Sequence, residues 1–436
     1  MAVSRSCRLI QIYRLVIAAT LLALGMLTNA SLLWAQAKPA TKAPGSFGIN
    51  PEWVSSPEML DALEELQRAG IVPGRKGSLS FFRWNGEKPP QLAHLGLWGE
   101  GVSDEVFARS VALSDLQFLS IYETNITNEG LQVLRKFSKL RSFSVAPVSR
   151  YEKSMYGAPQ WSYPFLKQRS DRPKITVQGL EPLRNIATIE SLQLIDAQLA
   201  PSDLAILQSW PKLGSIALST TMTSEAVQHL AACKRVSNLT LGYREITADE
   251  IRALGEWESL KKLMLLHAKL SSDALAALAS LESLEQLDLE ECNLTDDDLA
   301  HLKLPAKLTI LGLKRNEIDG PGLRHLVPFQ LKQIGLEFNN ISNATLGELA
   351  QLRTLETLNL SYCRQIDNQG IESGVLQRMT HVRQLGLRGL KQVTDASLAE
   401  IVKMTHLKHI TIRETGISWE SVDKMKAAMP ETVVFK

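Results

Sequence analysis

Aliphatic residues recur along most of the chain at a fixed spacing, and this spacing predicts the architecture. The best-preserved example is Leu284, Leu287, Leu289, Cys292 and Leu294, which spells L-x-x-L-x-L-x-x-C-x-L. Segments in the same frame begin at residues 92, 116, 140, 189, 213, 236, 260, 284, 308, 331, 355, 382 and 407. All successive starts are 23 to 27 residues apart except one step of 49, from 140 to 189. A period in the twenties predicts a stacked solenoid.

Each repeat predicts a strand followed by a short helix. Leu287 and Leu289 alternate with polar residues, as in a strand with one buried face. Thr295 and the three acids after it then predict a helix start, because the hydroxyl accepts from free N–H groups and the acids suit the positive helix end. One repeat cannot bury its own leucines. Stacking therefore predicts an α/β solenoid with one parallel sheet and helices behind it.

The repeat resembles the leucine-rich repeat family, in its helix-backed bacterial type of roughly 24 residues and in the cysteine-containing, ribonuclease-inhibitor-like repeats of F-box adaptors. The resemblance covers about residues 92–430 and implies a horseshoe with the sheet on the concave face and short helices on the convex face. It also implies that the eighth residue after each first leucine hydrogen-bonds the neighbouring loop. Good matches there are Thr124, Thr221, Cys292, Asn316, Asn339, Cys363 and Thr415, whereas Ala197, Arg244 and Ala268 depart from the pattern. We therefore expect an interrupted polar ladder, and the fold itself does not specify a function.

The N-terminus predicts a secretory signal over residues 1–37. Arg5, Arg8 and Arg14 precede an apolar run from Leu15 to Leu27, and Ala35-Gln36-Ala37 is a small-residue cleavage sequence. The mature chain is then expected to start near Lys38 and to be exported, as a periplasmic, cell-surface or secreted protein. The alternative is an uncleaved anchor, since an apolar run continued to Trp34 approaches the length that spans a bilayer. With cleavage, we expect no membrane insertion.

The segments flanking the repeats have their own patterns. Residues 38–55 are rich in Pro, Ala, Gly and Ser, which predicts a flexible linker. Residues 56–91 are predicted to form an N-terminal helical cap, because Ser56-Pro57 favours a helix start and an end repeat needs a cover. Residues 92–430 form the predicted solenoid, and 431–436 are predicted to be a closing strand.

Cysteine usage argues against a disulfide-stabilised protein, and net charge argues against a nucleic-acid-binding one. After signal removal the chain keeps Cys233, Cys292 and Cys363. The last two hold equivalent positions three repeats apart, about 14 Å at the ordinary strand spacing, which is beyond disulfide reach. All three are interpreted as small core residues. The formal net charge of +2 lacks the basic excess of nucleic-acid-binding proteins.

The 49-residue step contains an insertion at about residues 148–174. It leaves from the exit edge of a strand and is rich in aromatic and basic residues. Long loops on rigid scaffolds concentrate function, and Tyr and Trp dominate many interfaces. We therefore predict a partner-binding surface built from Trp98, Phe118 and Tyr122 on the sheet face with Tyr151, Tyr156, Trp161 and Tyr163 in the insertion. The alternative is that the insertion only covers the sheet aromatics.

A second candidate surface lies at the sixth position after each first leucine. Glu290, Lys314 and Glu337 alternate in sign on successive predicted strands, so they are expected to pair across the sheet. Arg388 and Arg413 follow without an acid in the same series, although Glu414 is close. Lys314, Arg388 and Arg413 are therefore candidates for contact with an anionic partner.

Catalytic signatures are weak throughout the sequence. The carboxylates at 296–298 belong to a predicted helix start, and the H-x-x-H at His406 and His409 lacks a supporting acid or cysteine cluster. No phosphate-binding glycine loop or nucleophile elbow occurs. We therefore expect no enzyme activity, no cofactor and no metal. The predicted function is an exported protein-binding leucine-rich-repeat protein. The alternatives are a cell-envelope polysaccharide-binding protein, or an adaptor in protein turnover, which the predicted signal opposes.

Overall fold

The computed structural model describes residues 57–58, 61, 80–83, 92–98, 101–122, 124–146, 151–153, 159–161 and 174–436. The predicted signal and linker lie outside these residues, as do Tyr156 and Tyr163 of the insertion. The chain divides into two compact units. Unit 1 comprises residues up to 220 together with 232–236, and unit 2 comprises residues 221–231 and 237–436.

Unit 1 has one sheet whose strands run parallel except at its first edge. The strand order is β1 (Ser80–Arg83), β2 (Leu92–Trp98), β3 (Phe118–Tyr122), β4 (Ser142–Ala146), β7 (Ser191–Leu194) and β8 (Ser215–Leu218). The sequence pattern did not predict β1, which pairs antiparallel with β2. A strand therefore lies along this edge, within the range where a helical cap was predicted and where the described residues 57, 58 and 61 are helical.

The insertion in unit 1 contains a small hairpin. Strands β5 (Tyr151–Lys153) and β6 (Pro159–Trp161) pair antiparallel, with Tyr151 opposite Trp161. This pairing places two of the predicted aromatic positions at one end of the hairpin. The hairpin was not evident from the sequence, where the segment was predicted only as a loop.

Unit 2 has one fully parallel sheet. Its strands are β9 (Asn238–Gly242), β11 (Lys262–Leu266), β13 (Gln286–Glu290), β14 (Ile310–Gly312), β15 (Gln333–Gly335), β16 (Thr357–Asn359), β17 (Gln384–Gly386), β18 (His409–Thr411) and β19 (Val433–Phe435). A separate two-stranded pair joins β10 (Glu245–Ile246) to β12 (Lys269–Leu270). Every neighbouring pair in the main sheet keeps equivalent repeat positions opposite each other, as for Leu287, Leu311 and Ile334.

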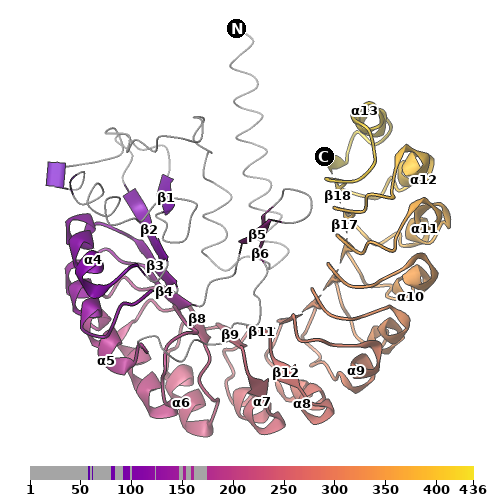
Figure 1. The fold of residues 1–436 in the computed structure, drawn as a ribbon. Helices are drawn as coiled ribbons and strands as arrows, with labels where there is room; N and C mark the ends of the chain where they lie inside the picture. Colours follow the sequence, from indigo (N-terminus) through magenta and orange to yellow (C-terminus); the bar gives the residue numbers. More distant parts are fainter. Residues whose placement is uncertain are drawn as a thin grey trace. The chain divides into compact units, whose positions relative to one another are not determined.

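Short helices return the chain from each strand to the next. In unit 1 these are α4 (Asp104–Ala108), η2 (Arg109–Leu113), η3 (Gly130–Lys136), α5 (Val177–Leu180), η4 (Glu181–Leu183) and η5 (Pro201–Ser209), and α6 (Ser224–Ala232) spans the boundary. In unit 2 they are α7 (Ala248–Gly255), α8 (Ser272–Ala277), η6 (Leu278–Ser280), α9 (Asp296–His301), η7 (Pro321–Leu326), η8 (Asn343–Thr345), α10 (Leu346–Leu349), α11 (Asn368–Glu372), η9 (Leu376–Arg378), η10 (Asp395–Ser397), α12 (Leu398–Ile401) and α13 (Trp419–Ala428). Elements named η are 3-10 helices. In unit 2 the helices lie on the opposite side of the sheet from its open face (Figure 1).

The leucines of the repeat form the core between sheet and helices. Leu284, Leu287 and Leu289 have no exposed surface, and Leu299 of α9 packs at 1% exposure. The equivalent aliphatic residues of the other described repeats are buried in the same way. Burying one such side chain contributes about 1.5–3 kcal/mol. The structure therefore confirms the predicted α/β leucine-rich repeat solenoid within each unit.

Consecutive repeats are also joined where their helices begin. Asn343 follows the helix cap Ser342, accepts from the Asp367 backbone N–H at 3.1 Å and donates to the Asp367 carboxylate at 2.6 Å. A Cβ atom at Gly370 would lie 2.1 Å from Asn343 Oδ1, so this contact requires glycine there. The same close approach joins Asp104 to Gly130, Asn128 to Gly179 and Asp296 to Gly322. We call these contacts cap joints.

Candidate functional site

The open face of unit 2 carries a group of charged side chains on β13 and just after β14 and β15. Asp288 and Glu290 belong to β13, and Lys314 and Glu337 follow β14 and β15 by two residues. We call Asp288, Glu290 and Glu337 the carboxylate cluster. The β-sheet register sets Asp288 beside Gly312, and Gly312 beside Gly335. Two successive strands therefore lack a side chain beside the cluster.

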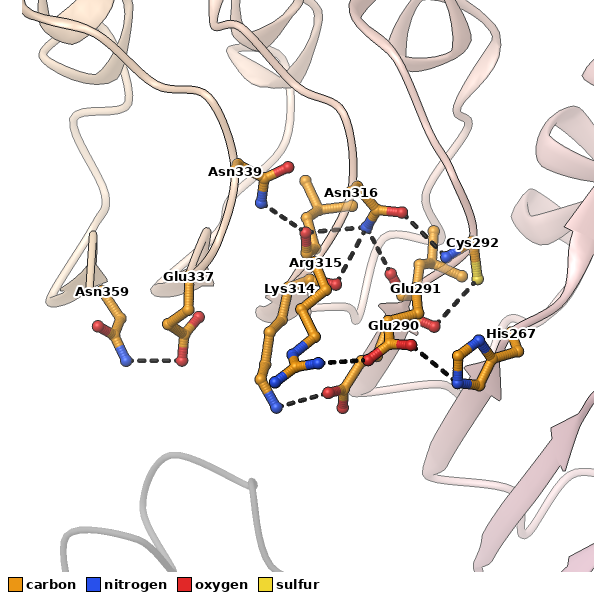
Figure 2. Close-up of polar contacts among 12 residues, drawn as sticks. His267, Glu290, Glu291, Cys292, Lys314, Arg315, Asn316, Glu337, Asn339 and Asn359 are labelled. Carbon is orange, nitrogen blue, oxygen red and sulfur yellow. Dashed lines mark hydrogen bonds and ion pairs between the residues drawn. The ribbon is translucent and has the colours of Figure 1, made fainter. Parts of the chain in front are cut away.

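The charges of this group pair only in part as predicted. Lys314 donates to Glu290 as an ion pair. Glu337 instead accepts a hydrogen bond from the Asn359 amide at 2.7 Å, and Figure 2 shows these two side chains directed toward each other. Glu337 is only 5% exposed, and its second oxygen, Oε2, has no hydrogen-bond partner. Of the predicted cross-strand pairs, the one between Glu290 and Lys314 therefore forms, whereas Glu337 keeps an oxygen without a donor.

Burial changes the acidity of two members of the cluster. Burial raises the pKa of Glu337 to about 7, against the opposing charge of Lys314 and with a further rise from Glu290 and Asp288. Burial likewise raises the pKa of Asp288 to about 7, although the Gln286 amide donates to its carboxylate at 2.8 Å. Each carboxylate therefore accepts from one neutral amide, which compensates only part of the cost of burying its charge.

A polar ladder fixes the strands that hold the cluster. Asn316 Oδ1 accepts from the backbone N–H groups of Cys292 and Leu294, both at 3.0 Å. Its Nδ2 donates to the carbonyls of Leu289 at 2.7 Å and Leu313 at 2.8 Å. The bonds to Cys292, Leu294 and Leu289 cross to the preceding repeat, and Figure 2 shows Asn316 beside Cys292. Asn339 repeats the arrangement, bonding Ile318, Leu313 and Leu336, and the thiols of Cys292 and Cys363 donate to the carbonyls of Leu265 and Leu336.

Arg244 replaces the usual ladder residue with an ion pair. Its guanidinium contacts Glu250 at 2.8 Å, and Glu250 also accepts from the backbone N–H of Met222 at 2.7 Å. Burial opposes ionisation of Glu250, but these bonds keep the pKa of its carboxyl below the usual value. The sequence departure at this position therefore does not leave the loop unbonded, which corrects the expected interruption here.

A row of residues with left-handed backbone conformation borders the open face, and it was not predicted from the sequence. Position seven after the first leucine has positive φ in eight successive repeats: Tyr243, His267, Glu291, Arg315, Phe338, Tyr362, Gly389 and Glu414. We call this the αL row. The backbone reversal turns each side chain along the edge of the sheet, where it meets its neighbour. The signal was present in the sequence as a column of polar and aromatic residues at one fixed repeat position.

Neighbours in the αL row contact one another through ion pairs and ring stacking. His267 lies 2.8 Å from the Glu291 carboxylate, and Arg315 donates to the same carboxylate at 2.9 Å. The Arg315 guanidinium lies over the Phe338 ring at 4.7 Å, and the Phe338 and Tyr362 rings stack at 4.3 Å. Burial opposes ionisation of Glu291, but His267 and Arg315 lower the pKa of its carboxyl. The αL row therefore clamps adjacent repeats from Tyr243 onward.

The three predicted cationic residues lie in different environments. Lys314 is paired with Glu290, and Arg388 donates to Glu414 through Nε at 3.0 Å and also through Nη2. The Arg388 guanidinium lies near the Tyr362 ring as well, 5.6 Å from its centroid. Glu414, which the sequence placed outside the series, is therefore the acid beside Arg388. Arg413 is exposed.

The predicted aromatic surface belongs to unit 1. Sheet register places Trp98 next to Tyr122, and His94 next to Phe118, on β2 and β3. Phe118 and Tyr122 are half-buried. Tyr151 and Trp161 take part in the β5–β6 hairpin through their backbones. Two adjacent strands therefore share an aromatic column, and Tyr156 and Tyr163 lie outside the described residues.

Metal-binding clusters and membrane-spanning helices do not occur among the described residues. No group of three or more His, Cys, Asp or Glu side chains there is arranged to hold a metal ion. No helix in the described part of the chain has the length and apolarity needed to cross a bilayer. Cys233, Cys292 and Cys363 are free and buried, and burial raises their pKa values to about 11, 12 and 12. These thiols are therefore protonated at neutral pH and are poor nucleophiles.

Comparison with known proteins gives a short sequence match and several structural ones. Residues 351–373 match the family model described as Leucine Rich repeat, and no curated protein matches the chain. An internalin from Listeria monocytogenes is 18% identical, covering 79% of this chain and 86% of its own, with a TM-score of 0.40. Rad7, solved in complex with Elc1 in yeast, is 14% identical over 77% and 84% of the two chains, with a TM-score of 0.41. A Leptospira interrogans LRR protein is 16% identical over 86% and 98%, with a TM-score of 0.36. The sequence match contains β16 and α11, which are the strand and helix of one repeat in unit 2.

Proposed function

This chain is a leucine-rich repeat protein, and we propose that it is an exported, non-enzymatic protein that binds another protein through its sheet face and its 148–174 insertion. Proteins of this fold commonly bind partners on the extended surface made by stacked strands. The observation that carries the proposal is the open face of unit 2. There the ladder residues and the αL row hold charged side chains at fixed positions, so a partner meets a surface that is already ordered.

The charges on this face suit recognition better than catalysis. Lys314, Arg388 and Arg413 are spread over several repeats rather than gathered around one reacting point. The buried thiols have raised pKa values, which opposes a nucleophilic role. An extended array of charges favours a partner of matching charge pattern, since such complementarity sets specificity and association rate.

The test is retention of a partner by the immobilised mature chain. We expect one or more exported proteins to bind, and Arg413→Glu on the sheet face to weaken binding at least ten-fold. Arg324→Glu, exposed in η7 on the helical side, is the matched control and should bind normally. Equal binding by both variants would contradict use of the unit 2 face.

The insertion adds a second candidate function, binding of a polysaccharide. The register of Trp98 with Tyr122 and of Tyr151 with Trp161 supports it, because paired aromatic positions make platforms for sugar rings. A glycan array and the protein retention assay distinguish the two functions when each is run with Trp161→Ala. Loss of signal in the glycan assay alone would favour the polysaccharide.

Export rests on the N-terminal sequence. Arg5, Arg8 and Arg14, the apolar run and Ala35-Gln36-Ala37 support cleavage near Lys38. N-terminal sequencing of the protein recovered outside the cytoplasm should begin near Lys38. Recovery of the full-length chain in the membrane fraction would instead support the uncleaved anchor.

A further inference from the structure

The carboxylate cluster has more acceptor capacity than its neighbours use. Glu337 Oε1 accepts from Asn359, but Oε2 is buried without a partner. Lys314, the nearby cation, donates to Glu290 instead. A buried carboxylate oxygen without a donor costs free energy, and a ligand that supplies a donor and a positive charge recovers it.

The two strands beside the cluster carry glycine at the same level of the sheet. Gly312 and Gly335 occupy the position in β14 and β15 that Asp288 and Asn359 occupy on the flanking strands. A Cβ atom on Gly312 would lie 2.1 Å from Asp288 Oδ1, so the Asp288 side chain extends over Gly312. Asp288 therefore reaches across its neighbouring strand in the direction of Glu337, whose pKa it helps to raise.

We propose that Asp288, Glu290 and Glu337, above Gly312 and Gly335, form a subsite for a guanidinium or ammonium side chain of a protein partner, with Glu337 Oε2 as the main acceptor. The proposal rests on the proposed protein-binding function and specifies one chemical feature of the partner. Charged hydrogen bonds of this kind are roughly twice as strong as neutral ones. Arginine suits the subsite because its planar fork of donors can serve two carboxylates at once.

Lys314 competes with the incoming group. Its side chain is 31% exposed, and its ammonium is held by Glu290. It is also the largest influence that opposes the raised pKa of Glu337. Removing its ammonium frees the Glu290 carboxylate and takes away the competing cation, so a cation from outside should bind more tightly.

The probe is the tripeptide acetyl-Gly-Arg-Gly-amide, compared with the same peptide carrying neutral citrulline, in ligand-observed NMR titrations of the full chain at pH 7.5. We expect the arginine peptide to bind at least ten-fold more tightly than the citrulline peptide. Glu337→Gln should remove this preference, whereas the control Glu317→Gln, exposed in the same repeat stack, should keep it. Equal binding of the two peptides, or an unchanged preference in Glu337→Gln, would overturn the proposal.

A second variant separates the subsite from general damage to the fold. Lys314→Gln should bind the arginine peptide several-fold more tightly, a gain that unfolding cannot produce. Weaker or unchanged binding by Lys314→Gln would contradict the proposed competition. Spermidine tests the other source of the same chemistry, and its binding without any binding of the peptide would refute a protein side chain as the ligand.

The proposed function and this subsite fail in different ways. If an exported protein binds the chain and Glu337→Gln leaves its affinity unchanged, the subsite is refuted and the proposed function stands. If the arginine peptide binds as expected while no protein partner is retained, the subsite stands and the proposed function is refuted.

Discussion

The Tyr362 hydroxyl donates a hydrogen bond to the Glu414 carboxylate at 3.0 Å, although a whole repeat lies between these two residues. The intervening member of the αL row is Gly389, which has φ +76°. A Cβ atom there would lie 2.2 Å from Tyr362 Cδ1. The glycine therefore leaves space for the Tyr362 ring. Through its hydroxyl, Tyr362 contacts Glu414 directly, past the one repeat whose residue in the αL row has no side chain.

Replacing this glycine should destabilise the protein. In Gly389→Ala the added methyl group clashes with the Tyr362 ring, and a non-glycine residue is forced into a left-handed conformation. Together these effects should lower the free energy of unfolding by about 2–4 kcal/mol. Gly347→Ala is the control, because nothing lies within 4 Å of its Cβ position in α10. It should stabilise the protein by about 0.5–1 kcal/mol. Urea unfolding of both variants measures the difference, and equal stabilities would contradict the steric argument.

Removing the central ladder residue should also have a large effect. Asn316→Ala leaves two backbone N–H groups and two carbonyls of neighbouring turns without their shared partner. A loss of about 3 kcal/mol is expected from the buried polar groups left unsatisfied. Asn340→Ala, exposed one residue beyond the next ladder asparagine, should change the free energy of unfolding by less than about 0.5 kcal/mol. Chemical denaturation of the two variants side by side tests this contrast.

Glu337 should make stability fall as the pH rises. Its pKa is about 7 in the folded chain and 4.5 as the ordinary value, so the folded state binds the proton more tightly between these values. Its stabilising protonation is complete below about pH 4.5 and is lost as the pH passes through 7, a difference on the order of 3 kcal/mol. Glu337→Gln should therefore be more stable than the unaltered chain at pH 8 and similar to it at pH 5.

This pH test isolates one group among several. Lys314, Glu290 and Asp288 face Glu337, and all three are present in both proteins. Subtracting the two unfolding curves at each pH therefore isolates the effect of the Glu337 side chain. A difference between the proteins that does not grow between pH 5 and pH 8 would show that Glu337 ionises normally.

The cysteines of the repeats should resist alkylation. Burial raises the pKa of the Cys292 and Cys363 thiols to about 12, and both donate to backbone carbonyls. In the native protein at pH 8, iodoacetamide should modify these two residues at least a hundred-fold more slowly than in urea. Peptide mass spectrometry measures each site separately. Rapid native modification of either one would contradict its place in the core.

Most of the fold could be predicted from the spacing of the repeats in the sequence. Positions such as Leu284, Leu287 and Leu289 repeat with a strict spacing, and apolar burial depends mainly on that spacing. The side-chain hydrogen bonds of Asn316 were implied by family resemblance and are confirmed. These features could be predicted because one physical requirement recurs in every repeat.

The remaining features depend on which two residues meet across a repeat boundary. Glu337 alternates in sign with Lys314, yet Lys314 donates to Glu290 and Glu337 accepts from the Asn359 amide on the next strand. The bond from Arg388 to Glu414 joins different repeat positions, so a single column of the sequence does not reveal it. The backbone pairing of β1 with β2 is likewise outside the repeat and was not predicted.

The cap joints restrict the order in which these coils can follow one another. Asn343 fits against the next repeat because residue 370 there is glycine. Asn368 instead packs against Ser397, whose hydroxyl donates to the Asn368 side chain at 2.7 Å. A coil moved to another place would bring its own small or hydroxyl residue against an unsuited partner. Duplication or loss of a coil during evolution should therefore survive mainly where the newly adjoining residues happen to fit. The order of the repeats is therefore constrained by specific contacts between residues of adjacent repeats.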